Sequence, residues 1–263
     1  MLSAKDISYS IGKKNILEGI SAAFQPGEFN MILGPNGSGK STFLKIISAE
    51  INDYNGTVLY EDKNARSYRK ETLAKCRAVM SQQPELSFPL TVEEVVMMGR
   101  YPHFNFSPGK NDEAVCNEVM ERMNLQAFRQ RNYLTLSGGE KQRVQYARVL
   151  AQIWEKPSEG YRYLFLDEPL SNLDISYQQE FLELAKEFAL KHTVVIAVMH
   201  DINLAIEYAD QLFFFKEGSL FLNGKPGDII TTELILNVYN VQTGIIQNPR
   251  SGKPLVLFSS GNY

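Results

Sequence analysis

The chain has 263 residues, 44% of them hydrophobic and 22% charged, and a formal net charge of −3 at pH 7. This composition is typical of a globular protein with a sizeable core, and it excludes disordered and collagen-like chains. Because there is no excess of positive charge to neutralise phosphates, nucleic-acid binding is not expected.

The sequence predicts a protein that stays in the cytoplasm. Its longest apolar stretches, at residues 163–166 and 194–199, are far too short to span a bilayer. The opening residues MLSAKDISYS contain an early acid and no continuous apolar stretch, so they do not resemble a signal peptide. Cys76 and Cys116 have neither disulfide-framework nor zinc-site spacing, which is consistent with a reducing compartment.

The predicted strands are of two kinds. Near the N-terminus, Ile7, Tyr9 and Ile11 alternate with polar residues, as do positions 56–60, and this period indicates half-exposed strands of an antiparallel part. Short continuous apolar runs indicate buried strands. These runs lie at residues 29–33, 78–80, 163–166 and 194–199.

Segments with helical spacing lie between the buried strands, at residues 42–47, 112–123, 137–151 and 177–189. Alternating strands and helices predict an α/β fold with a mostly parallel sheet and helices on its faces. Residues from about 84 to 152 contain little strand-like sequence, which predicts a helical subdomain inserted in the sheet. We expect a single domain over residues 1–263, with a short C-terminal tail from about 219 to 263.

A phosphate-binding loop is predicted at residues 34–42, GPNGSGKST, which match G-x-x-x-x-G-K-[ST] between a predicted strand and a predicted helix. Glycines let backbone N–H groups and the helix N-terminus point at phosphate oxygens. Lys40 would reach the β- and γ-phosphates, Ser41 would offer its hydroxyl to Mg²⁺, and Thr42 would bond the α-phosphate. The candidate nucleotide-binding residues are Gly34, Pro35, Asn36, Gly37, Ser38, Gly39, Lys40, Ser41 and Thr42.

Acidic, imidazole and amide groups follow the predicted buried strands. Asp167 and Glu168 end one of these runs, and His200 ends another. Since ligands of open α/β sheets bind at the carboxyl ends of strands, Asp167 is a candidate for Mg²⁺ and Glu168 for the base that orients the attacking water. His200 is a candidate for contact with the γ-phosphate. Gln82 is a candidate for Mg²⁺ or the water, with its neighbour Gln83 as a competitor.

A capping box between Ser137 and Glu140 opens another predicted helix, and this pattern starts many ordinary helices. Here two glycines, Gly138 and Gly139, follow the cap directly. They leave the helix N-terminus open to a phosphate, so Ser137, Gly138 and Gly139 also form a candidate second anion site.

The motifs occur in the order of the ATP-binding cassette (ABC) ATPases, which this sequence resembles over nearly its whole length: 34–42, Gln82, 136–143, 163–169, 171–174 and His200. The resemblance implies a P-loop NTPase of the ABC type, with a RecA-like, mostly parallel sheet core, an antiparallel β part and an inserted helical subdomain. It implies hydrolysis of ATP with Mg²⁺. The implied catalytic residues are Glu168, His200 and Gln82, and the implied metal-binding residues are Ser41, Gln82 and Asp167.

The resemblance also implies partners. One phosphate loop and one copy of residues 137–139 per chain imply a head-to-tail homodimer, in which each ATP lies between the loop of one subunit and residues 137–139 of the other. Asp174 would belong to the loop that communicates across this dimer. The helical subdomain between Gln82 and Ser137 would dock on polytopic permease subunits at the cytoplasmic face of the inner membrane, and the sequence near residues 82–100 would convert ATP state into transporter motion. A substrate-binding protein would be an indirect partner.

Three segments narrow the resemblance. Residues 97–103, MMGRYPH, resemble importers of iron chelates, haem and cobalamin, and the 152–163 loop and the 248–255 segment look most like haem importers. These segments imply haem uptake; ferric siderophore or cobalamin uptake and a soluble ATPase of iron–sulfur assembly are the alternatives. Many ABC ATPases stack an aromatic residue on adenine where this chain has Ile11, and Tyr9 lies two residues earlier, so the adenine contact stays open.

Overall fold

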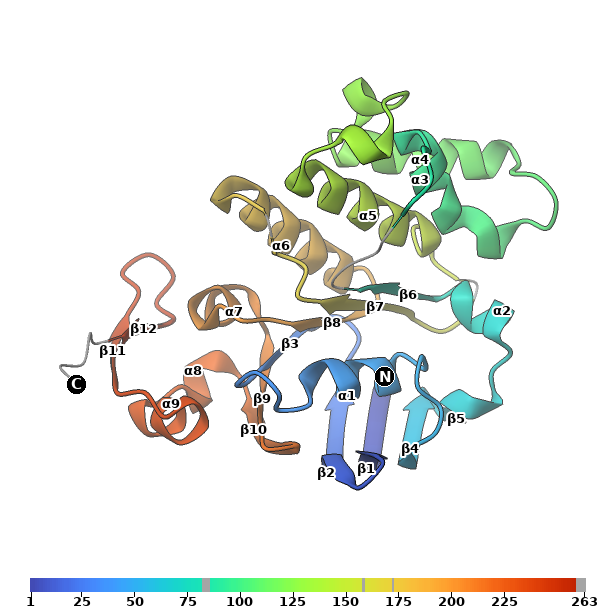
Figure 1. Cartoon of the computed structure of the whole chain (residues 1–263). Helices are drawn as coiled ribbons and strands as arrows, with labels where there is room; N and C mark the ends of the chain where they lie inside the picture. The colour runs from blue at the N-terminus through green and yellow to red at the C-terminus, as the bar shows by residue number, and fades with distance from the viewer. Residues whose placement is uncertain (82–85, 158, 172, 259–263) are drawn as a thin grey trace. The chain divides into compact units, whose positions relative to one another are not determined.

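The structure is a computed structural model that describes residues 1–81, 86–157, 159–171 and 173–258. The chain forms two compact units, Met1–Ser67 with Leu182–Tyr263, and Tyr68–Phe181, and each is described by itself (Figure 1). The expectation of a single domain with a subdomain from about residue 84 stays a prediction.

The first unit begins with an antiparallel sheet. Its strands are β1 (Leu2–Ile11), β2 (Lys14–Phe24), β4 (Asn55–Tyr60) and β5 (Lys63–Asn64), in the order β2-β1-β4-β5. The predicted antiparallel part is therefore confirmed. Its strict alternation is not, because the β1–β2 register shifts on both sides of Tyr9. Ile7 is fully buried, whereas Ile11 is 61% exposed.

A parallel core follows in the same unit. Strand β3 (Phe29–Leu33) pairs in parallel with β8 (Thr193–Val198) on one side and β9 (Gln211–Lys216) on the other. Every residue of β3 and β8 is buried, as expected for parallel strands covered on both faces. Helix α1 (Lys40–Ile47) follows β3, and its Phe43 ring lies 5.1 Å from the ring of Phe215.

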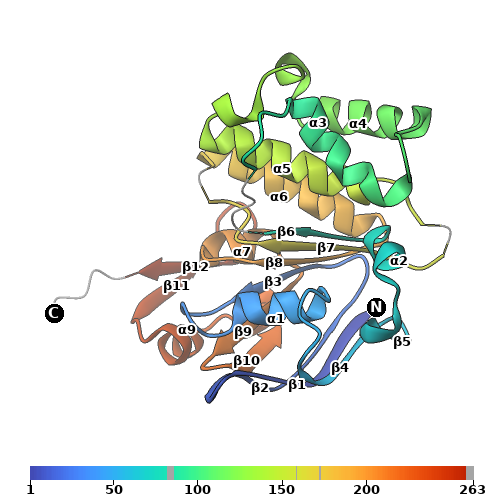
Figure 2. The same ribbon diagram turned by 45° about the vertical axis from the view of Figure 1, so that its right-hand side comes forward.

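The C-terminal part of the first unit contains strands and helices. Strand β10 (Ser219–Gly224) pairs antiparallel with β9, and helices α8 (Pro226–Ile229) and α9 (Thr232–Tyr239) follow. The hairpin of β11 (Thr243–Gln247) and β12 (Pro254–Phe258) packs on α7 (Ile202–Tyr208) (Figure 2). Asn203 holds it there, since its Nδ2 donates to the Val256 oxygen at 3.0 Å and its Oδ1 accepts from the Val256 amide at 2.8 Å.

The second unit joins two parallel strands to a group of helices. Strand β6 (Arg77–Met80) pairs with β7 (Arg162–Asp167), and Met80 lies opposite Leu166. Between them α3 (Val92–Met97), the 3₁₀ segment 98–103, α4 (Lys110–Arg122) and α5 (Gly138–Gln152) pack side by side (Figure 2). Between residues 86 and 157 the described chain contains helices and 3₁₀ turns but no strand beyond an isolated bridge. The remaining helices are α2 (Lys70–Ala74) and α6 (Ile175–Leu190), which leads into the first unit.

Candidate functional site

The predicted phosphate loop connects β3 to α1 and is held by its own lysine. Lys40 is only 5% exposed, and its Nζ donates to the carbonyl oxygens of Gly34 at 2.8 Å and Pro35 at 2.9 Å. These bonds close the loop around the ammonium group. The lysine that would meet phosphate is thus positioned by the loop backbone itself.

Two glycines of the loop are required by close contacts. A Cβ on Gly34, where φ is +147°, would lie 2.1 Å from the carbonyl oxygen of Phe215 on β9. A Cβ on Gly39, where φ is +95°, would lie 2.5 Å from Leu17 Cδ2 on β2. The loop is therefore confined between two strands of its own unit, in a backbone conformation that L-residues rarely adopt.

The loop fits a polyphosphate. Gly39 is the N-cap of α1 and carries no side chain that could cap the first amides of the helix. Ser38 is 3% exposed, and its hydroxyl has no hydrogen-bond partner among the described residues. Amides at a helix N-terminus, a buried ammonium group and a buried hydroxyl are the donors that bind phosphate oxygens.

A pocket of about 700 Å³ lies beside the loop. Residues 35–38, Lys216, Glu217 and the end of α9 line it. Burial raises the pKa of the Tyr239 hydroxyl well above its usual value, and a hydrogen bond with the Gly34 backbone opposes this only in part. Sequence analysis missed this neighbour of the loop, because no local pattern marks a contact between residues so far apart.

His200 lies at the same sheet edge as the phosphate loop. Strands β3 and β8 are parallel, with Ile32 opposite Val198, so both chains leave the sheet at one edge. The Met199 amide donates to the Ile32 oxygen at 3.0 Å, which carries this pairing up to His200. His200 itself is exposed, and the next residue, Asp201, caps α7 by accepting from the Leu204 amide at 2.9 Å.

In the second unit, the two acids end β7 as the sequence predicts. Asp167 is 6% exposed, and Glu168 adopts a left-handed conformation with φ of 49°. Such a conformation is strained for a residue with a side chain and often marks a functional site. Because Met80 lies opposite Leu166, β6 ends at the same edge as these acids. Gln82 and Gln83 follow β6 but lie outside the described residues.

The candidate second anion site is the N-terminus of α5. The predicted capping box is confirmed: Ser137 Oγ accepts from the Glu140 amide at 3.3 Å, and the Ser137 amide donates to Glu140 Oε2 at 2.7 Å. The latter bond holds the pKa of Glu140 below its usual value. Ser137 and Gly138 are exposed, so this helix end is accessible within its unit.

Asp174 stabilises the start of α6. Its Oδ1 accepts from the Tyr177 amide at 3.0 Å and from the Ser176 hydroxyl at 2.8 Å. The hydrogen bond from the Tyr177 backbone N–H lowers the pKa of the Asp174 carboxyl. Helix α5 contacts the start of α6, since the Arg143 guanidinium lies 3.9 Å from the centre of the Tyr177 ring.

The described residues contain no group of three or more His, Cys, Asp or Glu side chains that could hold a metal ion by itself. The Asp167 carboxylate, a candidate Mg²⁺ ligand, is the kind of donor that a nucleotide-bound Mg²⁺ takes, because such ions bind one or two carboxylates and complete their shell with phosphate oxygens and water. In the same part of the chain, no helix has the length and apolar character needed to cross a membrane.

Comparison with known proteins places the chain in a family. The family model described as "ABC transporter" matches residues 17–171. The hemin import ATP-binding protein HmuV of Gloeobacter violaceus is 42% identical over 98% of this chain and 94% of its own length. The protein of the same name from Mesorhizobium japonicum is 40% identical over the full length of both chains.

Solved structures agree with this assignment. The dimeric structure of MJ0796, a bacterial ABC transporter cassette, has a TM-score of 0.72 and 26% identity, covering 86% of this chain and 98% of that one. The predicted α/β fold of ABC type is thereby confirmed. The chain belongs to the ABC transporter family, as an ATP-binding subunit that hydrolyses ATP.

Proposed function

We propose that this chain is the ATP-hydrolysing subunit of an importer that takes up haem and that it acts at the cytoplasmic face of the inner membrane. The observation that carries the proposal is identity of 40% or more, over nearly the full length, with two proteins named for hemin import. The alignment with the Mesorhizobium japonicum protein covers the whole chain, and it therefore includes the 152–163 and 248–255 segments, where the sequence resembles haem importers.

We assign roles to the phosphate-binding groups from their chemistry. The Lys40 ammonium group neutralises the β- and γ-phosphates, and the Ser41 hydroxyl and Asp167 carboxylate are the proposed Mg²⁺ ligands. When bound, Mg²⁺ withdraws charge from the phosphate oxygens. Glu168 orients the attacking water and accepts its proton, and His200 donates a hydrogen bond to the γ-phosphate.

The remaining assignments concern the working unit. Gln82 is proposed for Mg²⁺ or the water. Ser137, Gly138 and Gly139 are proposed to bind the nucleotide of a second copy, which makes the active form a homodimer. The exposure of this helix end and the dimeric state of the similar MJ0796 cassette support that arrangement.

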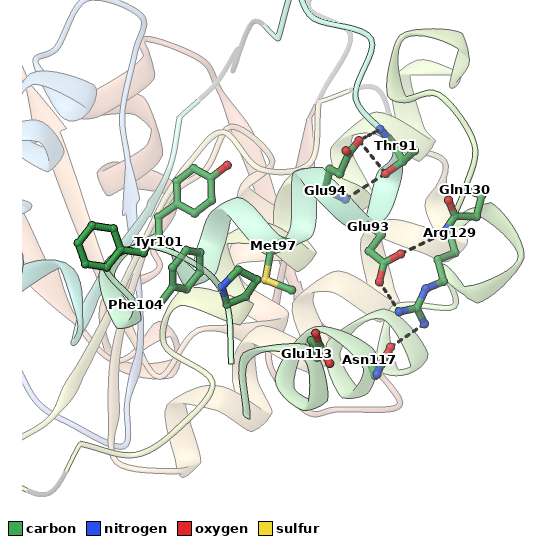
Figure 3. A pocket seen from close by; sticks show the side chains of 12 residues that line it. Thr91, Glu93, Glu94, Met97, Tyr101, Phe104, Glu113, Asn117, Arg129 and Gln130 are labelled. Atoms are coloured by element: carbon green, nitrogen blue, oxygen red, sulfur yellow. Dashed lines mark hydrogen bonds and ion pairs between the residues drawn. The ribbon is translucent and has the colours of Figure 1, made fainter. Parts of the chain in front are cut away.

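We propose that the second unit docks a membrane permease at one of its pockets. A pocket of about 660 Å³ lies over α3 and α4 and the 3₁₀ segment between them (Figure 3). One end is apolar, with Met97, Tyr101 and Phe104. The other end is polar, where Glu93 accepts hydrogen bonds from the side chains of Arg129 and Gln130. A short permease helix with an apolar anchor and a polar end fits this surface.

The test is ATPase activity of the chain reconstituted in liposomes with its permease, with and without haem on the cognate binding protein. Haem is expected to stimulate turnover. Stimulation by a ferric siderophore or cobalamin instead would keep the importer assignment and replace the substrate. Glu168→Gln is expected to retain ATP binding and a stable ATP-bound dimer while losing turnover, and unchanged turnover would refute the role of Glu168.

A further inference from the structure

Residues 99–103 pack against the last turn of α5. A Cβ on Gly99 would lie 2.1 Å from the carbonyl oxygen of Arg148, so the two backbones are in direct contact. The next residue, Arg100, donates from Nη1 to the carbonyl oxygen of Ala151 at 2.8 Å. Only glycine allows this approach, and the approach brings the Arg100 guanidinium within reach of the helix end.

His103 makes a second hydrogen bond to this turn of α5. Its Nε2 lies 2.8 Å from the carbonyl oxygen of Gln152, the last residue of α5. Burial lowers the pKa of this imidazole, so near pH 7 the ring is neutral and Nε2–H is the donor. Helix ends leave four carbonyls without intrahelical partners, and two of them are here satisfied by one five-residue segment.

Arg100 is held rigidly for this role. It is 1% exposed, with Nε 3.0 Å from Asp112 Oδ1 on α4 and Nη2 2.6 Å from Glu155 Oε2 in the 152–163 loop. A buried guanidinium that lost both acids would keep an uncompensated charge, and the loss of either acid removes one of its two ion pairs. The segment therefore ties three elements to one side chain: α4, the end of α5 and the following loop.

Part of the stretch from Met97 to Phe104 also lines the proposed docking pocket. Met97, Tyr101 and Phe104 face the pocket, while Gly99, Arg100 and His103 contact the neighbouring helices. Helix α5 runs from its contact with residues 99–103 to Ser137 at its other end. The segment that forms part of the pocket wall is thus bonded directly to the helix that begins after Ser137.

We propose that Gly99, Arg100 and His103 are positioning residues that fasten the permease-docking pocket to the last turn of α5, so that movement of a docked permease segment reaches residues 137–139 at the first turn. The inference rests on the proposed function for its partner. The fastening itself is a property of the second unit alone.

Two variants isolate the fastening. Gly99→Ala introduces a methyl group that must displace the Arg148 carbonyl, whereas Gly109→Ala, in the same unit, introduces one whose nearest neighbour is Asp112 Oδ2 at 3.7 Å. His103→Gln keeps a side-chain donor for the Gln152 oxygen, and His103→Ala removes it. Gly99→Ala and His103→Ala form the test pair, and Gly109→Ala and His103→Gln are their controls.

The first measurement is ATP turnover with and without the permease. In the test pair, stimulation of kcat by the permease is expected to fall at least about fivefold, the lower end of common coupling strengths. ATP affinity, basal turnover and permease binding stay within about twofold of wild type, and both controls retain stimulation. Full stimulation in the test pair, or loss of permease binding in parallel with stimulation, would overturn the inference.

A second measurement needs neither haem nor permease. If residues 98–103 are fastened to α5, their amides and those of residues 148–152 exchange hydrogen in one cooperative opening, and Gly99→Ala separates the two rates. Unrelated exchange rates in the wild-type chain would refute the fastening. A wild-type chain with cooperative exchange but no response to any permease would refute the proposed function and leave the fastening intact.

Discussion

The substitution Gly34→Ala tests whether close packing against β9 positions the phosphate loop. Replacement by alanine has two consequences: φ of +147° becomes strained, and the new methyl group meets the Phe215 carbonyl at 2.1 Å. A matched control exists at Gly27, where φ is +91° but no described heavy atom lies within 4 Å of the added Cβ. Gly27→Ala therefore carries backbone strain alone.

The cost of backbone strain and the cost of the close contact can be measured separately. Placing an L-residue in a left-handed conformation costs about 1–2 kcal/mol, and an extra methyl group in a packed site costs about 1–3 kcal/mol more. We expect Gly27→Ala to lower the free energy of unfolding by about 1–2 kcal/mol and Gly34→Ala by about 2–5 kcal/mol. Only Gly34→Ala should also weaken ATP binding, because only there must the loop move.

The assay pairs urea unfolding with titration of a fluorescent ATP analogue. Equal losses of stability in the two variants, with unchanged ATP affinity in Gly34→Ala, would refute the reasoning. That result would mean that β9 yields easily and that the close contact does not position the loop.

Three further predictions concern other parts of the chain. Burial raises the pKa of Cys116 to about 12, so at pH 8 iodoacetamide should label the half-buried Cys76 in native protein and reach Cys116 only after unfolding; labelling of both thiols would contradict this. Asn203→Ala removes both hydrogen bonds to the Val256 backbone and should lower the free energy of opening the β11–β12 hairpin by about 1–3 kcal/mol. The measurement is hydrogen exchange of the Val256 amide, which should become faster; an unchanged rate would refute the anchoring role. The folded-state pKa of Glu140 is lowered, so its stabilising effect is present above the unfolded pKa of about 4.3 and is lost as pH falls through the folded-state pKa. The difference in free energy of unfolding between wild type and Glu140→Gln should therefore shrink in acid. A difference that is constant between pH 3 and 7 would contradict the stabilising role of the ionised Glu140.

The elements that could be predicted are those whose local pattern has one physical meaning. The run 29–33 was predicted as a buried strand and has the bounds of β3, because a short apolar run followed by glycine suits a strand covered on both faces. The capping box at Ser137 was predicted for the same reason: its hydrogen bonds join residues three apart. The phosphate loop combines both kinds of signal.

Features that depend on distant residues could not be predicted from a local pattern. The partners of Arg100 lie 12, 51 and 55 residues away, so a stretch that resembled an importer motif gave no sign of a buried ion-pair centre. The alternation through Tyr9 broke at a bulge that only pairing with β2 reveals. The expected tail forms a strand, two helices and a hairpin because α7 and β9 offer surfaces for it.

The most direct test of the central claim is uptake of haem into liposomes that contain the permease and this chain, with ATP supplied on the side of the chain. Wild type is expected to accumulate haem in proportion to the ATP consumed, and Glu168→Gln to bind ATP without accumulation. Haem uptake that proceeds equally with Glu168→Gln, or ATP consumption that no delivered substrate alters, would contradict the account.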